Sequence, residues 1–141
     1  MLKEILCTAI ALACFGGSAM AQDVNSTPNH EKKAIKIVQT AGRQQLGSFA
    51  PDFARYNDDI LFGEVWSKND VLSLHDRSIV TLSALIAQGI TDSSLKYHLQ
   101  TAKENGVTKE EIAEIITQLG FYSGWPKAWA AFNQAKEIYG E

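Results

Sequence analysis

A capping box followed by helically spaced apolar residues is the strongest structural signal in this chain. Thr108 and Glu111 occupy the two ends of a T-x-x-E box, in which each side chain bonds the backbone N–H of the other residue. The apolar residues that follow recur at intervals of three, four and seven: Ile112, Ile115, Ile116 and Leu119. This spacing gathers them on one face of a helix, and such a face must be covered by another packed element.

The other segments favour helices as well. Capping residues, prolines and glycines predict helices over 28–41, 51–62, 73–88, 92–105, from 108 onward, and over 126–139. No segment shows sustained period-two alternation or a fixed repeat, so strands and repeat architectures are not expected. We therefore predict an all-α fold, a compact bundle of about six helices joined by short loops.

The first 21 residues have the pattern of a secretory signal. Lys3 precedes an apolar run from Ile5 to Phe15, and Ala19-Met20-Ala21 supplies the small-x-small pattern that signal peptidase reads. A retained anchor is the alternative, but the run is shorter than the roughly 20 residues that span a bilayer. We expect cleavage after Ala21 and a periplasmic or secreted protein with no membrane contact afterwards.

The expected organisation of the chain is therefore a signal peptide at 1–21, a flexible lead at 22–27 and a helical domain at 28–141. Both cysteines, Cys7 and Cys14, lie in the signal. The mature protein would contain no cysteine, which excludes disulfides and thiol chemistry.

The charge balance argues against a nucleic-acid partner. The 141 residues contain 13 Lys and Arg against 16 Asp and Glu, for a net charge of −3. A protein that neutralises a run of phosphates needs a basic excess, and this chain has none.

Three polar residues lie where a helix bundle usually places apolar ones. His98 is three residues after Leu95 and four before Ala102, which puts it on the inward face of its helix. Arg77 lies beside the apolar positions of its predicted helix, and Glu64 precedes a Val-Trp pair. A hydrogen-bonded core histidine, a snorkelling surface arginine and a solvated loop carboxylate are the structural alternatives.

Together, an imidazole, a guanidinium and a carboxylate can bind an anion and move a proton. His30, His75 and His98 are far apart, and none has the i+4 partner of a helical zinc site. The chain also lacks a Walker loop, a dinucleotide fingerprint and a G-x-S-x-G motif. We expect neither a metal nor a cofactor.

Several ordered fragments carry a family resemblance: Phe62–Ser67, Asp76-Arg77, His98, Asn105–Thr108, Glu110–Ile112 and Tyr122–Pro126. Their order and spacing, from Phe53 to Phe132, resemble the carboxymuconolactone decarboxylase family. The resemblance implies an all-α fold that assembles into homo-oligomeric rings, commonly trimers or hexamers, with the pocket at subunit contacts. Exposed aromatic residues near Trp125 and Trp129 would then have a partner surface to cover.

The family has two chemistries. Members similar to alkyl hydroperoxidase D carry C-x-x-C-x-x-x-H, and the corresponding positions here are Thr91, Ser94 and His98. Hydroxyl groups cannot form the redox disulfide, so an antioxidant hydroperoxidase activity is the least favoured alternative. A non-catalytic binding or assembly protein on the same fold is the other alternative.

The decarboxylase branch fits the remaining residues better. The resemblance implies a cofactor-free lyase acting on an anionic small molecule, a carboxylated lactone or a relative of one. Arg77 would bind the substrate carboxylate, His98 would transfer a proton, and Glu64 would orient the imidazole. Trp66, Tyr122 and Trp125 would wall the pocket, although core packing is an alternative for them.

Overall fold

The computed structural model describes residues 33–140. Within them the chain forms six α-helices and one π-helix, and no strand: α1 (Ala41–Leu46), α2 (Pro51–Arg55), η1 (Tyr56–Trp66), α3 (Leu74–Gln88), α4 (Ser93–Glu104), α5 (Lys109–Ser123) and α6 (Trp125–Tyr139). The all-α prediction is confirmed. The predicted signal peptide and the lead at 22–27 lie outside the described residues.

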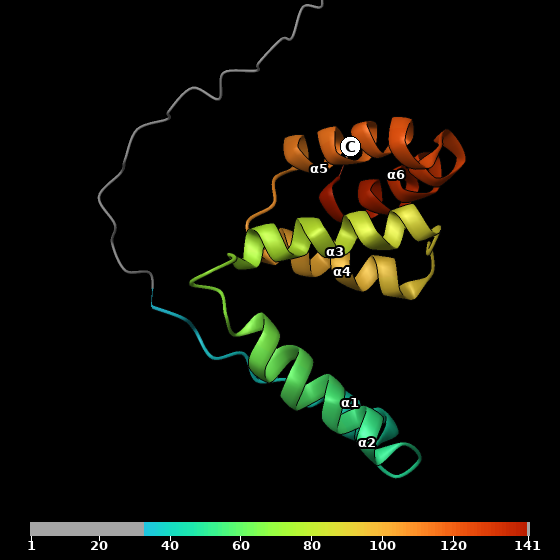
Figure 1. Ribbon diagram of the computed structural model, residues 1–141. Helices are drawn as coiled ribbons and strands as arrows, with labels where there is room; N and C mark the ends of the chain where they lie inside the picture. Colours follow the sequence, from blue (N-terminus) through green and yellow to red (C-terminus); the bar gives the residue numbers. More distant parts are fainter. Residues whose placement is uncertain (1–32, 141) are drawn as a thin grey trace, which may run out of the picture. The chain divides into compact units, whose positions relative to one another are not determined.

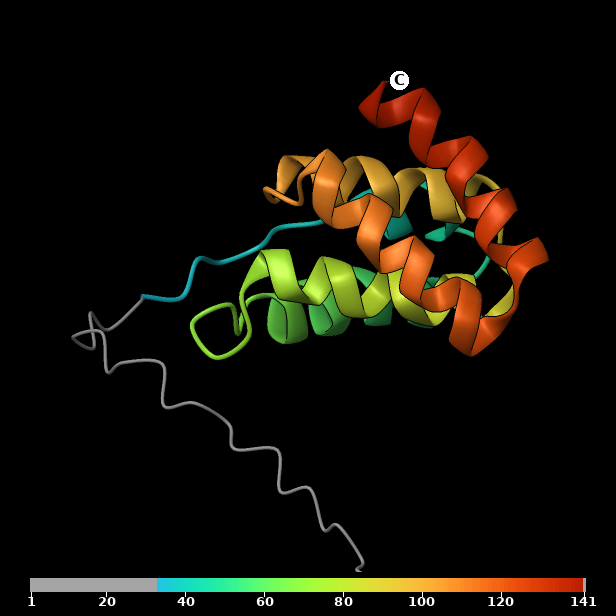
Figure 2. The ribbon, with the colours of Figure 1, turned by 90° about the horizontal axis from the view of Figure 1, so that it is seen from above.

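Helices α3 to α6 form a four-helix core (Figure 1). Helix α5 packs on α6 and α3, and α4 packs on α3 and α6, an arrangement that Figure 2 shows from above. The largest fully buried apolar side chains belong to this unit: Leu82, Ile86, Leu95, Leu99, Val107 and Ile116. No helix among residues 33–140 is long and apolar enough to cross a membrane.

The predicted caps set the ends of these helices. The Ser73 hydroxyl accepts a hydrogen bond from the Asp76 backbone N–H at 3.0 Å at the start of α3. The Thr108–Glu111 box is complete, with bonds of 3.1 and 2.8 Å. Gly89 ends α3 with φ at +79°, a conformation that costs glycine little because it has no Cβ.

Two predictions for the N-terminal segment are wrong. Residues 33–40 are not helical, and α1 begins at Ala41. The backbone N–H groups of Ile35 and Ile37 instead donate to the side chains of Asn69 and Ser67, both at 2.8 Å. These bonds replace the backbone bonds of a helix, so the segment is held by side chains distant in sequence.

Gly63 does not end the second predicted helix, because η1 continues through it to Trp66. Gly63 is buried, and its carbonyl accepts a hydrogen bond from the Lys36 ammonium. Helix α2 and η1 therefore follow each other without a break from Pro51 to Trp66.

A buried carboxylate joins α1 to η1. Asp58, on η1, is 2% exposed and accepts bonds from the backbone N–H groups of Gly42 and Arg43, both at 2.9 Å. The Arg43 guanidinium and the Asn57 amide donate to it at 3.3 and 3.0 Å. Burial raises the pKa of Asp58, but the hydrogen bonds from Asn57, Arg43 and Gly42 outweigh it and hold the pKa below its ordinary value.

His75 connects the first turns of α3 and α5. Its Nδ1 lies 3.0 Å from the Asp76 carboxylate, and its Nε2 lies 3.2 Å from both Glu111 oxygens. The hydrogen bonds to Asp76 and then Glu111 raise the pKa of His75 above its ordinary value. The protonated imidazole thus stabilises the fold.

We expect this stabilisation to depend on pH. It is fully present below the unfolded histidine pKa of about 6.5 and is lost as the pH rises through the raised pKa of the folded state. His75→Gln should lower the free energy of unfolding by up to about 1 kcal/mol at low pH, the range of partly exposed ion pairs. Urea unfolding of both proteins over a pH series measures this, and an equal loss at alkaline pH would contradict it.

Candidate active site

A cavity with a volume of ≈ 470 Å³ is lined by α1, α2, η1, α4 and the segment before α1. We call it the α4 cavity. Its apolar wall consists of Ala41, Gly42, Leu46, Phe53, Leu61 and Phe62. Its polar residues are Gln39, Gln45, Asn57, Ser93, Ser94, Tyr97 and His98.

His98 is the imidazole of this cavity. Leu95, Leu99 and Ala102 of α4 are buried in the core, and His98, next to them on the helix, is half-buried and lines the cavity. The ring of Tyr97 packs against it edge-on, with centroids 5.0 Å apart. Burial lowers the pKa of His98, so the imidazole is mostly neutral at pH 7.

The polar side chains that line the α4 cavity with His98 are neutral. The Gln39 side-chain oxygen accepts from the backbone N–H groups of Thr40 and Ala41 at 2.9 and 3.0 Å, and its amide donates to the Tyr97 hydroxyl at 3.4 Å. No Lys, Arg, Asp or Glu of the described chain lines the cavity. The chain's own contribution is therefore a weakly polar, uncharged environment around one histidine.

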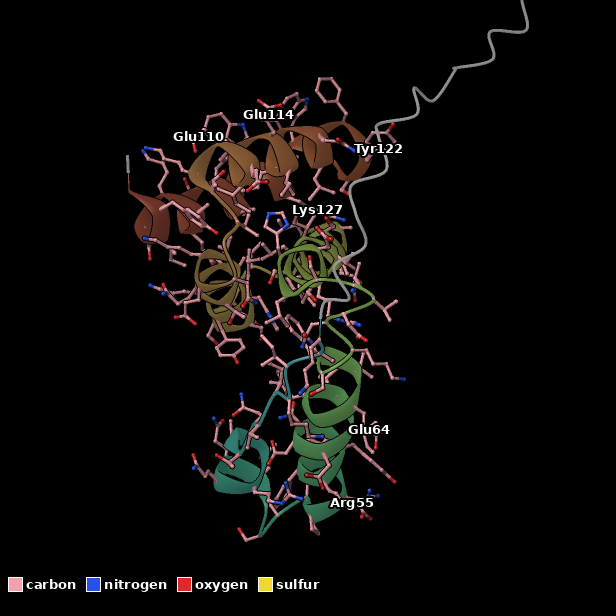
Figure 3. The ribbon with its side chains drawn as sticks, turned by 90° about the vertical axis from the view of Figure 1, so that its left-hand side faces the viewer. Arg55, Glu64, Glu110, Glu114, Tyr122 and Lys127 are labelled. Atoms are coloured by element: carbon pink, nitrogen blue, oxygen red, sulfur yellow. The ribbon has the colours of Figure 1, made fainter. Side chains whose placement is uncertain are left out.

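Glu64 and Arg77 lie outside this cavity. Glu64 is exposed on η1 (Figure 3). The Arg77 guanidinium donates to the Lys68 carbonyl at 2.9 Å, and its Nε is buried without a hydrogen-bond partner. Of Glu64, Arg77 and His98, only His98 lines the α4 cavity of its own chain.

The three aromatic residues expected at the pocket also lie outside the α4 cavity. Trp66 is 7% exposed and packs against Phe62, with ring centroids 5.7 Å apart. Tyr122, near the end of α5, is exposed (Figure 3), and Trp125, the first residue of α6, is exposed as well. The walls come instead from Phe53, Leu61 and other residues whose role no sequence pattern indicated.

The structure also describes Thr91 and Ser94, the two positions that correspond to the cysteines of the thiol motif. Ser94 lines the α4 cavity beside His98, and the Thr91 carbonyl accepts a hydrogen bond from Gln134. A hydroxyl thus stands near the imidazole where the redox branch has a thiolate. No cluster of three or more His, Cys, Asp or Glu residues within 33–140 is arranged to hold a metal ion.

Comparison with known proteins places the chain in a family. The sequence profile of the carboxymuconolactone decarboxylase family matches residues 51–137, a span that includes α2 to α5 and most of α6. The chain belongs to the carboxymuconolactone decarboxylase family, which confirms the resemblance seen in the sequence.

Individual relatives agree with this assignment. The chain is 38% identical over 96 residues to 4-carboxymuconolactone decarboxylase of Acinetobacter baylyi, covering 68% of this chain and 70% of the relative. It is 30% identical over 128 residues to an uncharacterized 15.0 kDa protein of Paracoccus denitrificans, covering 89% and 86%. Peroxisomal protein 2 of Schizosaccharomyces pombe is 33% identical over 82 residues, 58% of this chain and 38% of the relative. Family and relatives together support a decarboxylase-like function.

Proposed function

We propose that this protein is a cofactor-free decarboxylase that releases CO2 from a carboxylated lactone or a closely related small cyclic acid in the α4 cavity. The observation that carries the proposal is the half-buried His98 imidazole that lines a cavity of ≈ 470 Å³. Membership of the family and the likeness to a protein named 4-carboxymuconolactone decarboxylase support the substrate class.

The proposed chemistry needs little from the protein. When the bond between the ring and the carboxylate breaks, its electron pair passes through the conjugated double bond to the lactone carbonyl oxygen. His98 then donates a proton to the carbon that accepts it and regains one from water. The electron sink belongs to the substrate, so the protein supplies the proton and the surroundings.

The lining of the α4 cavity suits the first step. Phe53, Leu61 and Phe62 give the cavity an apolar wall, and a carboxylate placed against this wall would be less solvated than in bulk water. In the transition state the negative charge is spread over the ring and the lactone oxygen. Loss of hydration therefore destabilises the transition state less than it destabilises the substrate carboxylate. The neutral side-chain amide of Gln45 also lines the cavity and can donate to that oxygen.

We also propose that the protein works as a homo-oligomer, a trimer or hexamer, in which Glu64 and Arg77 reach the cavity of a neighbouring copy. Both lie outside the cavity of their own chain, and the planar guanidinium of Arg77 suits a carboxylate. Large apolar side chains are exposed on the same chain: Phe49 (88%), Phe53 (62%), Tyr122 (84%), Trp125 (52%) and Trp129 (67%). Such exposure is characteristic of a surface that a partner covers.

In the same oligomer Tyr122 and Trp125 would face substrate only across a subunit contact, whereas Trp66 acts through packing in its own chain. We place the mature protein outside the cytoplasm, because residues 1–21 have the pattern of a cleaved signal.

The decisive experiment mixes the purified protein with 4-carboxymuconolactone and measures CO2 release. We expect turnover that thiol-blocking reagents leave unchanged, from a species whose mass in light scattering is several times that of one chain. Binding of the lactone without CO2 release would contradict the enzyme and indicate a binding protein. Turnover by a species with the mass of one chain would contradict the shared site but not the reaction.

A further inference from the structure

The α4 cavity contains a tyrosine to which the reaction described above gives no part. Tyr97 and His98 are neighbours on α4, and both line the cavity. Their rings meet edge-on, with centroids 5.0 Å apart. Tyr97 is 48% exposed, so it is accessible to a small molecule that enters the cavity.

Gln39 fixes the direction of the hydrogen bond that the Tyr97 hydroxyl makes. The Gln39 side-chain oxygen accepts from the backbone N–H groups of Thr40 and Ala41 at 2.9 and 3.0 Å. The opposite orientation of the amide would place its NH2 group against these two donors, where it could make no hydrogen bond. The NH2 end therefore faces Tyr97 and donates to its hydroxyl at 3.4 Å.

The Tyr97 hydroxyl is thus an acceptor toward Gln39 and retains its own hydrogen for another partner. A hydroxyl has one O–H to donate besides its acceptor lone pairs. No residue within 33–140 accepts this hydrogen. Gln39 is itself a lining residue, so the bond between the two side chains lies at the cavity surface. An acceptor brought into the cavity can take the Tyr97 hydrogen without breaking an existing bond.

The lining of the cavity determines which acceptor gains most from this donor. No charged side chain of the described residues lines the α4 cavity, so within one chain neutral donors must stabilise any negative charge that forms there. Hydrogen bonds to an ionised acceptor are roughly twice as strong as those between neutral groups. The Tyr97 O–H therefore stabilises an oxygen that becomes negative during the reaction more than it stabilises the same oxygen in the substrate.

We propose that the Tyr97 hydroxyl donates a hydrogen bond to the lactone oxygen on which negative charge develops as CO2 leaves, and that Gln39 is the positioning residue that keeps this O–H available to the substrate. Tyr97 retains its proton, so the proton that reaches the carbon still comes from His98. Because the Tyr97 and His98 rings are in contact, one conjugated substrate can reach both donors. The inference rests on the decarboxylation proposed above.

Tyr97→Phe tests the hydrogen bond, because it keeps the ring that packs on His98 and removes only the hydroxyl. We expect kcat for CO2 release from 4-carboxymuconolactone to fall by roughly 10- to 100-fold, less than for a fully enclosed oxyanion donor. KM should change by less than about threefold, since the bond strengthens only in the transition state. Tyr56→Phe is the matched control: Tyr56 is an exposed tyrosine outside the cavity lining, and its replacement should leave both constants near the wild-type values.

Gln39→Glu reverses the direction of the bond between residues 39 and 97. One carboxylate oxygen can still accept from Thr40 and Ala41, but the other has no hydrogen and accepts from Tyr97, which turns the O–H away from the substrate. We expect kcat to fall about as much as in Tyr97→Phe, and to fall no further in the double variant. KM should rise in both backgrounds, because the added charge repels an anionic substrate. Additive losses in kcat would contradict the positioning role of Gln39.

A binding measurement separates this inference from the reaction itself. 4-Nitrophenolate carries negative charge on an oxygen conjugated with its ring, as the proposed transition state does, whereas benzoate carries an ordinary carboxylate. Each probe is titrated into the full-length protein by calorimetry, at a pH where it is ionised. Tyr97→Phe should weaken 4-nitrophenolate binding by about 10-fold or more, the range of a hydrogen bond to a charged group, and should weaken benzoate binding much less.

The outcomes distinguish the hydrogen bond from the enzyme. Binding of 4-nitrophenolate that depends on Tyr97, in a wild type that releases no CO2, would disprove the decarboxylase and still identify the Tyr97 hydroxyl as a donor to an oxyanion. Equal binding by the wild type and Tyr97→Phe, or no binding by the wild type, would overturn the inference at any level of activity. A loss confined to benzoate would assign Tyr97 to the substrate carboxylate and overturn it as well, as would an unchanged kcat in Tyr97→Phe.

Discussion

Replacing His98 with Asn should lower the rate of CO2 release by roughly 10²- to 10⁴-fold, the usual contribution of a general acid or base. Asparagine retains hydrogen-bonding capacity but does not titrate near neutral pH. Because His98 is half-buried and lines the α4 cavity rather than the closed core, the fold should survive. We expect kcat to fall much more than KM changes, since the proton transfer belongs to the reaction and not to binding.

The pH profile gives a second measure of the same role. A proton donor must be protonated in the free enzyme, and burial lowers the pKa of His98 below its ordinary value. The wild-type kcat/KM should therefore be constant at low pH and fall as the pH rises through a value below about 6.5. His98→Asn should lack this dependence.

His75→Asn is the matched control, because His75 lies outside the α4 cavity and its replacement should leave turnover per folded molecule unchanged. Two results would remove His98 from the proposed role. One is a less stable variant with full activity per folded molecule, which would identify a hydrogen-bonded structural histidine. The other is a wild-type profile that rises with pH, which would show that the neutral imidazole is the active form.

The substitution Gly42→Ala should destabilise the protein by about 1–3 kcal/mol, the range for atoms added to a closely packed site. A Cβ at Gly42 would lie 2.7 Å from the Asp58 carboxylate and 2.8 Å from the Ala54 carbonyl. Neither neighbour can easily move, since one is backbone and the other is held by several hydrogen bonds. Thermal unfolding should show a decrease of several degrees in Tm.

Gly63→Ala is the matched control for this effect. Gly63 is also buried near Asp58, but a Cβ there meets its nearest atom, the Asp58 carbonyl, at 3.2 Å. Alanine gains about 1 kcal/mol over glycine in a helix interior, which offsets the tight contact. We expect little net change in stability, and an equal loss in both variants would contradict the steric explanation for Gly42.

The two substitutions should also differ in function. Gly42 lines the α4 cavity and Gly63 does not. In an assay with a saturable substrate, Gly42→Ala should raise KM even at temperatures where the variant is folded, because the displaced α1 forms part of the cavity wall. Gly63→Ala should leave KM near the wild-type value.

Helices with local start and stop signals could be predicted from sequence. Ser73, Thr108 and Gly89 act within a few residues of the ends that they define, so their effect is visible in a short window. The segment 33–40 could not be predicted this way, because Asn69 takes the backbone N–H of Ile35 from 34 residues away. These tertiary hydrogen bonds override the local signals that predict a helix over 28–41.

The candidate site, too, could be predicted from the sequence only in part. His98 could be identified because a polar residue on the apolar face of a helix is unusual. Gln39 and Asn57 could not, since each becomes part of the α4 cavity only when α1, η1 and α4 pack together. Sequence also suggested that Glu64 and Arg77 accompany His98, and a single chain does not bring them into its own cavity.

The hydrogen bonds of Asp58 give the α4 cavity and the four-helix core different tolerances to acid. Asp58 stabilises the fold as a carboxylate, and its pKa in the folded protein lies below its ordinary value. Its contribution to stability is therefore present at pH values above the pKa of Asp58 in the unfolded chain. This contribution is lost as the pH falls through the pKa of Asp58 in the folded protein. Its bonds hold α1 against η1, whereas apolar side chains of α3 to α6 form the main core. In strong acid the wall of the α4 cavity should therefore loosen while the four-helix core persists, and inactivation would precede unfolding.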